Sequence, residues 1–456
     1  MNVDFQNIRV VYFIGIGGIG MSAIARFFNE RGVEVHGYDK TETALTKKLV
    51  EEGMKIHYTD DVSFIPKTTD LVVYTPAVPK DHSELLYFQK RGNEVLKRSQ
   101  VLGFISKNFK TIAVGGTHGK TSTSSLVTHI LRVGGTDCIA FLGGIAENYA
   151  SNYIAGKGKW IVVEADEYDR SFLQLYPTIS IVTSMDPDHL DIYGTEEEIV
   201  KTYNQFANQS KEYGVVLTVD GLPLEIEPRY ENKIFKKTYG VDNGNFKSEN
   251  IRFEDGFIVF DFSSPLGKLP NLKYTQPGKH NIENATAAIA VAQHVGVDEE
   301  KIREALMSFK GVKRRFDIVY RSENVTYIDD YAHHPTELKA AISAARMLYP
   351  TKKITGIFQP HLYSRTRDFQ DGFAEALDML DEILLLDIYP ARELPIDHVT
   401  SEIIFDKMKN NNKKMVNKSN LMEILSQYNV EILLSLGAGD IDKFVQPIQA
   451  WLEEKY

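Results

Sequence analysis

Residues 111–125 read Thr-Ile-Ala-Val-Gly-Gly-Thr-His-Gly-Lys-Thr-Ser-Thr-Ser-Ser, and the rest of the chain is organised around this stretch. The apolar run 112–114 predicts a buried parallel strand, residues 115–119 a glycine-rich turn, and the apolar spacing after Lys120 an amphipathic helix. Converging backbone N–H groups and the positive end of a helix attract anions. Strand, glycine turn and helix therefore predict a polyphosphate site.

Within this phosphate loop, Lys120 can neutralise the outer phosphates and the Thr121 hydroxyl can bind magnesium. The motif is a shortened variant of G-x-x-x-x-G-K-[ST], because Val114 stands where the first glycine is expected. An ordinary glycine turn is the alternative, but the flanking strand and helix favour a nucleotide site. The predicted nucleotide contacts are Gly116, Thr117, His118, Gly119, Lys120, Thr121 and Ser122.

Composition limits the remaining possibilities. A chain of 456 residues is long enough for two or three domains. The net charge of −10 argues against a general nucleic-acid binder. The single cysteine, Cys138, allows no intrachain disulfide, and no uninterrupted apolar run reaches ~18 residues. We expect a cytoplasmic protein with neither a nucleic-acid nor a membrane partner.

A second glycine loop, Gly-Ile-Gly-Gly-Ile-Gly at 15–20, lies between predicted strands 9–16 and 33–38. It has the form G-x-G-x-x-G, and Asp39 follows about 20 residues after it. The pattern indicates a diphosphate, which NAD and a nucleotide sugar share; tight packing without a ligand is the alternative. Asp39 could bond a ribose or simply end its strand. Arg98, in the loop after a short strand, could bind an anion or form a surface salt bridge.

Acidic clusters follow two further predicted strands, at 164–169 and 186–191. Ligands in open α/β sheets bind beyond the carboxyl ends of strands, so both clusters and the phosphate loop are expected at one site. Residues 224–275 alternate in polarity and predict an antiparallel ribbon. Asn281 and Asn284 then lie near the start of an alanine-rich helix; capping and adenine contact are both open for Asn281.

A basic segment at 311–316 precedes a third α/β region. Polar side chains again follow two of its predicted strands, and they indicate a pocket for an anion or a carboxylate. They are His333, His334, His361, Arg365 and Arg367.

Taken together, these motifs resemble those of the Mur ligases over essentially the full length. The resemblance rests on 15–20, 116–121, Glu164-Ala-Asp-Glu167, Asp188-His189, His280-Asn281 with Asn284, Arg314-Arg-Phe316, 329–335 and Gln359-Pro-His361. It implies an α/β fold with three domains: a Rossmann-like UDP-sugar domain (1–108), a central ATP-binding domain with a parallel sheet and an antiparallel ribbon (109–312), and a Rossmann-like amino-acid domain (313–456).

The resemblance also implies a reaction. The carboxylate of UDP-N-acetylmuramate is joined to L-alanine through an acyl phosphate, at the expense of ATP, in peptidoglycan precursor synthesis in bacteria. Mg²⁺ is the implied metal, with Mn²⁺ as a substitute, bound by Thr121, Glu164 and His189. Because histidine is an unusual magnesium ligand, His189 could act through water instead.

Further roles are implied residue by residue. Lys120, His189 and His333 would act in catalysis, with His333 accepting the amine proton as a hypothesis. Nucleotide contacts would add Asn284, Arg315 and Asp330 to the phosphate loop. The UDP-sugar would contact Gly15, Gly17, Gly18, Gly20, Asp39, Thr75 and Arg98, and alanine would contact Tyr331, His333, His361 and Arg365.

Two departures from the family pattern stand out. Leu362 stands where an arginine is expected, which leaves Arg365 a larger share of carboxylate binding, and Lys279 stands where arginine is common. Three alternatives remain: a ligase of the same family that attaches a whole peptide, an NAD-dependent oxidoreductase, and a non-catalytic nucleotide sensor. The oligomeric state, monomer or homodimer, is left open.

Overall fold

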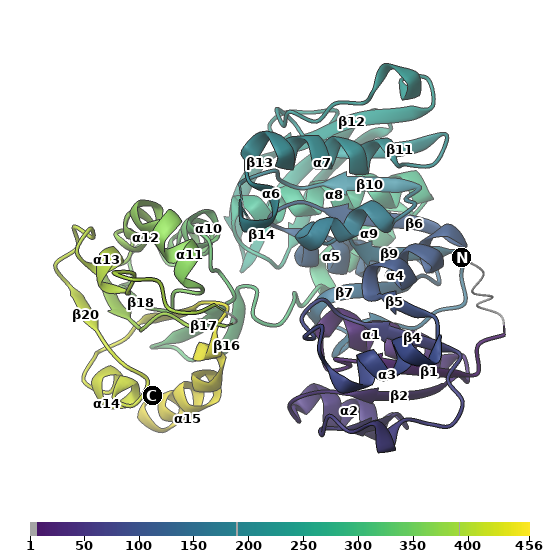
Figure 1. The fold of residues 1–456 in the computed structure, drawn as a ribbon. Helices are drawn as coiled ribbons and strands as arrows, with labels where there is room; N and C mark the ends of the chain where they lie inside the picture. The colour runs from purple at the N-terminus through teal and green to yellow at the C-terminus, as the bar shows by residue number, and fades with distance from the viewer. Residues whose placement is uncertain (1–6, 188–189, 392) are drawn as a thin grey trace. The chain divides into compact units, whose positions relative to one another are not determined.

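The computed structural model describes residues 7–187, 190–391 and 393–456, and these fold into three sheets flanked by helices (Figure 1). The predicted α/β class is confirmed. The chain forms two compact units, which are described separately. The first takes the chain up to Glu249 with Asp261–Pro270 and Asn284–Ser308; the second takes Asn250–Phe260, Asn271–Glu283 and Phe309–Tyr456.

The first sheet has the strand order β3-β2-β1-β4-β5, with every pair parallel. Its strands are β1 (Val10–Ile14), β2 (Glu34–Tyr38), β3 (Lys55–His57), β4 (Leu71–Tyr74) and β5 (Val95–Lys97). The helices are α1 (Ile19–Glu30), α2 (Ala44–Glu51), α3 (Ser83–Arg91) and α4 (Arg98–Lys107). Helix α4 begins at Arg98 itself, so the prediction that placed Arg98 in a loop before the helix is wrong.

Alternate residues of β1 face opposite layers, as the period of a strand requires. Val11 and Phe13 pack in the apolar cluster that contains residues of α1, α2 and α4. Tyr12 and Ile14 pack instead with Leu85 of α3 and its neighbours. Burial on both faces explains the nearly continuous apolar run that marks a parallel strand in this sequence.

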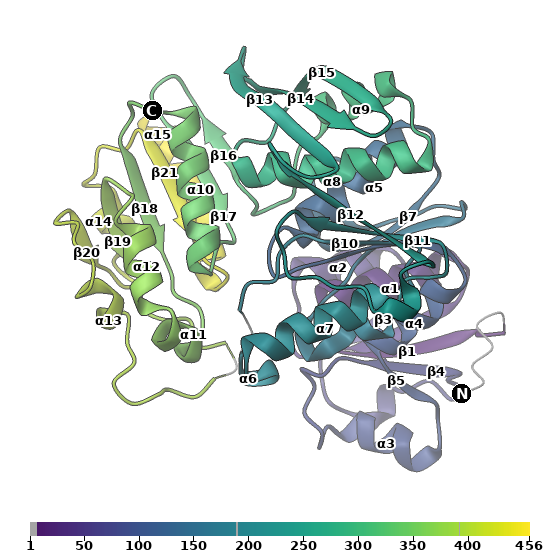
Figure 2. The ribbon, with the colours of Figure 1, turned by 90° about the horizontal axis from the view of Figure 1, so that it is seen from above.

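The middle sheet runs β15-β14-β13-β12-β11-β10-β6-β9-β7-β8. Its strands are β6 (Lys110–Gly115), β7 (Ile139–Ala146), β8 (Ser151–Ile154), β9 (Trp160–Glu164), β10 (Ile179–Val182), β11 (Gly214–Val219), β12 (Ile234–Val241), β13 (Phe246–Glu254), β14 (Phe257–Ser264) and β15 (Gly267–Tyr274). The helices of this region are α5 (Lys120–Val133), α6 (Leu190–Tyr193), α7 (Glu196–Asn208), α8 (Lys279–Val295) and α9 (Glu299–Ser308). Strand β6 pairs in parallel with β10 and β9, which places the carboxyl ends of all three at one edge. Strand β11 continues the sheet between β10 and β12 (Figure 2).

The antiparallel ribbon predicted for residues 224–275 differs from the prediction at its first pair of strands. Strands β12 and β13 pair in parallel, with Tyr239 opposite Phe246. The chain loops back within a few residues, because Asp242 and Gly244 both adopt left-handed conformations there (φ 68° and 94°).

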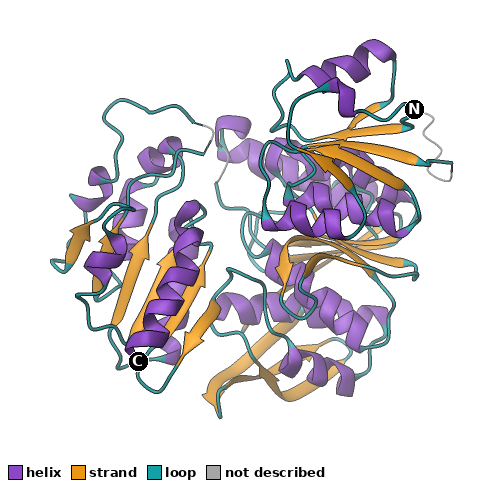
Figure 3. Ribbon diagram, turned by 90° about the horizontal axis from the view of Figure 1, so that it is seen from below, coloured by secondary structure: helices purple, strands orange, loops and turns teal. Residues whose placement is uncertain are grey.

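The third sheet has the order β16-β17-β21-β18-β19-β20, parallel except for the β16–β17 pair. Its strands are β16 (Asp317–Arg321), β17 (Thr326–Asp330), β18 (Ile354–Phe358), β19 (Glu382–Leu385), β20 (Lys413–Met415) and β21 (Ile432–Leu436). The helices are α10 (Pro335–Leu348), α11 (Tyr363–Asp368), α12 (Gln370–Leu377), α13 (Glu402–Phe405), α14 (Leu421–Leu425) and α15 (Val445–Lys455). Residues of α10, α12 and α13 cover one face and residues of α14 and α15 the other. Figure 3 shows helices on both faces of the sheet.

The side chains of Tyr12 and Glu84 form a buried polar contact between the first sheet and helix α3. The Tyr12 hydroxyl donates to Glu84 Oε2 at 2.8 Å and lies 2.7 Å from His57 Nε2. Glu84 has no exposed surface. Burial raises the pKa of Glu84 to about 7, although the hydrogen bond from Tyr12 opposes the shift. A carboxyl group with a raised folded-state pKa keeps a proton that the unfolded chain has already released.

Stability should therefore fall as pH rises from about 4.5 to about 7, and Glu84→Gln should remove much of that dependence. The difference between the ordinary pKa of 4.5 and about 7 corresponds to about 3 kcal/mol at most. Thermal melting at pH 5 and pH 8 measures the effect. The exposed Glu51 on α2 offers a control, since Glu51→Gln should melt like the parent chain at both pH values. Equal losses in Glu84→Gln and the parent chain would contradict this assignment.

Candidate active site

The first glycine loop gathers the side chains that the sequence predicted for it. Gly15 is left-handed (φ +85°), and a Cβ placed there would lie 2.8 Å from Thr75 Cγ2. A Cβ on Gly20 would lie 2.7 Å from Arg98 Nη1. The Gly17 N–H donates to Asp39 Oδ2 at 2.7 Å. Thr75, Arg98 and Asp39 therefore surround the loop, and Asp39 holds its backbone by accepting a hydrogen bond.

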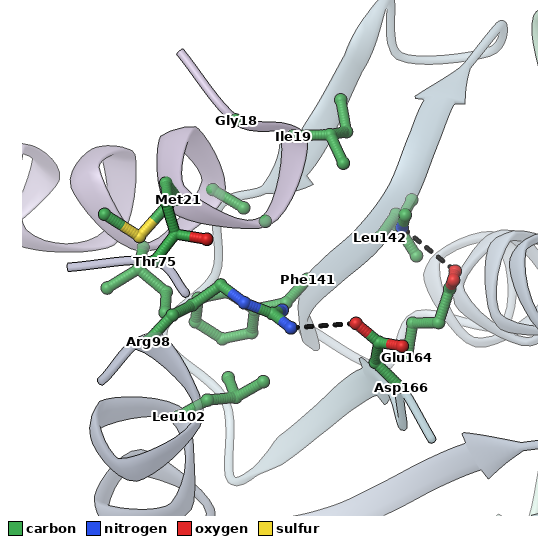
Figure 4. Close-up of a pocket in the computed structure, with 14 residues that line it drawn as sticks. Gly18, Ile19, Met21, Thr75, Arg98, Leu102, Phe141, Leu142, Glu164 and Asp166 are labelled. Carbon is green, nitrogen blue, oxygen red and sulfur yellow. Dashed lines mark hydrogen bonds and ion pairs between the residues drawn. The ribbon is translucent and has the colours of Figure 1, made fainter. Parts of the chain in front are cut away.

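A cavity of about 310 Å³ opens beside this loop (Figure 4). Its lining includes Gly18, Thr75 and Arg98 from the first sheet's region and Glu164 and Asp166 at the end of β9. Arg98 Nη2 lies 2.9 Å from Asp166 Oδ2, and Glu164 Oε2 accepts the Gly143 N–H at 3.0 Å. The Gly15–Gly20 loop thus faces two carboxylates of the central sheet across one cavity.

The phosphate loop joins β6 to α5 and is fastened to the end of β10. The His118 N–H donates to Ser184 Oγ at 2.7 Å, and the Thr117 hydroxyl donates to the Asp186 carbonyl at 2.8 Å. Gly116 has φ +136° and Gly119 φ +79°, conformations that favour glycine. Helix α5 begins at Lys120, so its unpaired N–H groups face the loop.

Lys120 forms an ion pair with Glu167, a residue that the motif search did not assign to the nucleotide. Lys120 Nζ lies 3.0 Å from Glu167 Oε1 and 2.9 Å from Oε2, and it donates to the Gly116 carbonyl at 2.7 Å. Burial alone would lower the pKa of Lys120, but attraction to Glu167, Glu164 and Asp166 raises it, which keeps the ammonium charged. Burial raises the pKa of Glu167 to about 7 against the opposing effect of Lys120.

The other predicted nucleotide and metal residues of the first unit can be placed individually. A Cβ on Gly119 would lie 2.8 Å from Asn284 Oδ1, so Asn284 sits directly against the loop. Thr121 is buried in the first turn of α5. His189 lies outside the described residues. Over the described ranges, no group of three or more His, Cys, Asp or Glu residues is arranged to hold a metal ion.

Asn281 and His280 belong to the second unit. The Asn281 side-chain amide donates to the Pro277 carbonyl at 2.7 Å, and α8 begins at Lys279. Asn281 therefore lies inside the first turn and is not the residue that caps the helix. Burial lowers the pKa of His280 to about 4, which keeps the imidazole neutral.

Asp330 secures the segment that enters the third sheet. Its carboxylate accepts the Phe316 N–H and the Ala332 N–H, both at 2.7 Å. Burial raises the pKa of Asp330 to about 7, with Arg315 opposing. The neighbouring Arg314 donates to Asp329 Oδ2 at 2.9 Å and to the Gly437 carbonyl at 2.7 Å. Its left-handed backbone (φ 61°) belongs to the turn that presents Arg315.

The predicted amino-acid residues converge at the ends of β17 and β18. The rings of Tyr331 and His333 lie 5.2 Å apart, and those of His333 and His361 6.0 Å apart. Arg365 Nη1 lies 3.2 Å from His361 Nδ1, and the Arg365 side chain is buried. His333, His361 and Arg365, which the sequence placed after separate strands, thus form one cluster. Of the other two residues predicted for this pocket, His334 caps α10 and Arg367 pairs with Asp368. Leu362, at the position of an expected arginine, is left-handed (φ 70°) and precedes α11.

The sequence did not predict individual roles for two acidic residues of these clusters, Glu167 and Glu337. Glu167 was visible only as one of several acids after β9, and Glu337 as the first acid of α10. Glu337 Oε2 accepts the His333 N–H at 3.0 Å, and Glu337 Oε1 lies 3.8 Å from Arg315 Nη1. The spacing of four residues between His333 and Glu337 was the available signal, since such pairs meet at the start of a helix.

Comparison with known proteins identifies the family. Three family models match in order: Mur ligase family, catalytic domain (residues 10–110), Mur ligase middle domain (114–292) and Mur ligase, glutamate ligase domain (314–439). The chain belongs to the Mur ligase family.

Individual relatives are similar over the full length of the chain. A UDP-N-acetylmuramate–L-alanine ligase of Cytophaga hutchinsonii is 46% identical, with 100% of this chain and 99% of that protein covered. One from Flavobacterium psychrophilum is 50% identical, covering 99% and 100%. The crystal structure of UDP-N-acetylmuramate-alanine ligase from Thermotoga maritima matches with a TM-score of 0.83 and 29% identity over 98% of this chain and 99% of that chain.

Replacing Gly116 by alanine should disrupt the phosphate loop. A Cβ there would overlap Thr183 Oγ1 and lie 2.8 Å from Ser184 N and 2.9 Å from Thr183 N, backbone atoms that cannot move aside. We expect ATP affinity to fall by about tenfold or more, measured by calorimetry. Gly135→Ala is the matched control: it has φ +80° but nothing within 4 Å, so it should cost about 1 kcal/mol of stability and leave ATP affinity unchanged. Equal affinities in the two variants would contradict the loop's role.

Proposed function

We propose that this protein joins the carboxylate of UDP-N-acetylmuramate to L-alanine, forming an amide bond while ATP becomes ADP and phosphate. The observation that carries the proposal is the shared cavity, in which the Gly15–Gly20 loop and Arg98 face Glu164 and Asp166. A sugar diphosphate in that loop would direct its acyl group toward the carboxylates beside the phosphate loop. Full-length relatives at 46% and 50% identity, named as ligases of this substrate pair, support the same reaction.

The chemistry explains why two phosphate-binding loops are needed. A carboxylate resists attack by an amine because its oxygen is a poor leaving group. Transfer of the terminal phosphoryl of ATP to that oxygen creates an acyl phosphate, which the amine of alanine then displaces. In phosphoryl transfer the protein mainly positions the reactants and stabilises negative charge. Such an enzyme must hold a sugar diphosphate and a nucleotide at once.

In this proposal Lys120 exchanges Glu167 for the β- and γ-phosphates of ATP, while the N–H groups of Gly116–Thr121 surround them. Asn284, which lies against Gly119, contacts the adenine. By the resemblance to the Mur ligases, Arg315 and Asp330 would also contact the nucleotide, and Asp330 holds the Phe316 backbone next to Arg315. His118 and Ser122 complete the nucleotide contacts.

The donor set fits a Mg²⁺ ion, with Mn²⁺ as a substitute. Glu164 presents a carboxylate at the end of β9 and Thr121 a hydroxyl in the first turn of α5, and magnesium prefers such oxygen ligands. These two residues, with His189 as a further ligand, would hold the ion. When bound, it would neutralise charge on the transferred phosphoryl group.

The remaining assignments are those that the resemblance to the Mur ligases implies. Gly15, Gly17, Gly18 and Gly20, with Asp39, Thr75 and Arg98, form the UDP-sugar site. Tyr331, His333, His361 and Arg365 form the alanine site, with Arg365 pairing the alanine carboxylate.

The domains would span 1–108, 109–312 and 313–456. The protein would act in the bacterial cytoplasm, where ATP is available, as a monomer or a homodimer. Among the described residues, no helix is long and apolar enough to cross a membrane.

Lys120→Ala should abolish phosphate release while UDP-N-acetylmuramate binding persists, because the two diphosphate loops lie on separate sheets. A coupled phosphate assay and calorimetric titration of the sugar nucleotide measure the two functions. Lys201 provides the control: its side chain is 64% exposed and pairs with Glu198 on the surface of α7, so Lys201→Ala should retain both. Loss of sugar-nucleotide binding in a folded Lys120→Ala variant would argue against separate sites.

Phosphate release with UDP-N-acetylmuramate, measured across single amino acids and a peptide acceptor, tests the function directly. We expect turnover with free alanine and little with the tripeptide, which would exclude the peptide-attaching alternative. If phosphate were released with the tripeptide and not with alanine, the tripeptide would be the substrate. Nicotinamide fluorescence should show no NAD binding, against the oxidoreductase, and absence of any phosphate release would favour the nucleotide sensor.

A further inference from the structure

Glu337 lies between His333, which the proposed function assigns to the alanine site, and Arg315, which it assigns to the nucleotide site. It lies in the first turn of α10, and its side chain is 13% exposed. One carboxylate oxygen, Oε2, contacts His333 through both the backbone N–H at 3.0 Å and the ring Nδ1 at 3.1 Å. The other, Oε1, lies 3.8 Å from Arg315 Nη1.

These contacts fix which ring nitrogen of His333 carries hydrogen. Nδ1 lies 3.0 Å from the Tyr331 carbonyl oxygen as well as 3.1 Å from Glu337 Oε2. Both neighbours are acceptors only, so Nδ1 must be the donor and the neutral ring keeps its lone pair on Nε2.

His361 has the opposite arrangement. Its Nδ1 lies 3.2 Å from Arg365 Nη1, and a guanidinium can only donate. Nδ1 therefore accepts, and Nε2 of His361 carries the hydrogen. The two rings lie 6.0 Å apart at an interplanar angle of 74°. An acceptor imidazole and a donor imidazole thus stand side by side at the ends of β17 and β18.

We propose that Glu337 is a positioning residue for amide bond formation, which orients His333 so that Nε2 accepts the proton of the incoming amine. The inference rests on the proposed function. A carboxylate that holds the Nδ1–H of a histidine is the arrangement that prepares an imidazole to accept a proton at Nε2. Arg315, bound to the other oxygen, limits the basicity that Glu337 confers until phosphate competes for the guanidinium.

The proton balance is complete without another reactant. Alanine arrives as an ammonium ion and gives one proton to His333 Nε2. Its nitrogen then attacks the carbonyl carbon of the acyl phosphate, the bond between that carbon and the phosphate oxygen breaks, and phosphate leaves. The departing phosphate takes the second nitrogen proton, and the amide keeps one hydrogen.

A purely structural role for Glu337 is the competing explanation, because an acid in the first turn also stabilises a helix. A double-mutant cycle separates the two. We expect Glu337→Gln to slow amide formation about tenfold or more while acyl phosphate trapping by hydroxylamine changes less than about twofold. In a His333→Gln background the same change should cost almost nothing further. Equal losses in both backgrounds would overturn the proposal.

Glu375→Gln is the matched control, since that carboxylate is 69% exposed and pairs with Lys339 on the surface of the same unit. It should behave as the parent chain in both half-reactions. Glu337→Asp, which keeps the charge, should recover part of the rate that Glu337→Gln loses.

Nitrogen-15 NMR of His333 supplies a readout that does not depend on turnover. The groups that face its ring include Glu337, Tyr331 and His361, with Arg315 beyond Glu337. Removing the carboxylate should lower the His333 pKa and move the acid limb of kcat/KM for alanine to lower pH. An unchanged His333 titration would overturn the proposal. Failure of the parent chain to form an acyl phosphate would instead refute the proposed function, and the NMR titration would still decide the role of Glu337.

Discussion

A buried positive charge at the turn between β6 and α5 constrains the whole central sheet. The ammonium of Lys120 is removed from most solvent, and such a charge is costly unless carboxylates lie close by. Glu167 provides the direct contact, while Glu164, the last residue of β9, and Asp166, in the loop after it, add attraction. Because β6 and β9 are neighbouring parallel strands, their carboxyl ends bring the lysine and the acids together without any further device.

The same acids connect the phosphate loop to the first sheet. Asp166 pairs with Arg98 at the start of α4, and Lys97 pairs with Asp169 nearby. The loop after β9 therefore holds Lys97 and Arg98 of the first sheet's region and, through Glu167, the lysine that begins α5. Each of these three cations has a carboxylate beside it.

The third sheet uses related physics for a different purpose. Asp329, Asp330 and Glu337 each hold a backbone N–H or an arginine of the segment that contains Arg314 and Arg315. Their bonds fix the turn that presents Arg315 and, through Glu337, the ring of His333. These acidic side chains therefore fix the positions of arginine and histidine side chains in this region.

Local patterns in the sequence determined the α/β class, both glycine loops and the strand ends after which Glu164, His333, His361 and Arg365 follow, because strand and helix periods and glycine conformations are local properties. The parallel step between β12 and β13, the pairing of Lys120 with Glu167 and the meeting of His333 with His361 were decided only by tertiary structure. Each depends on which segments meet in space, and residues such as Lys120 and Glu167 are 47 positions apart. When several acids follow a strand, the sequence does not indicate which of them will pair with a given cation. Strand order and burial determine the pairing.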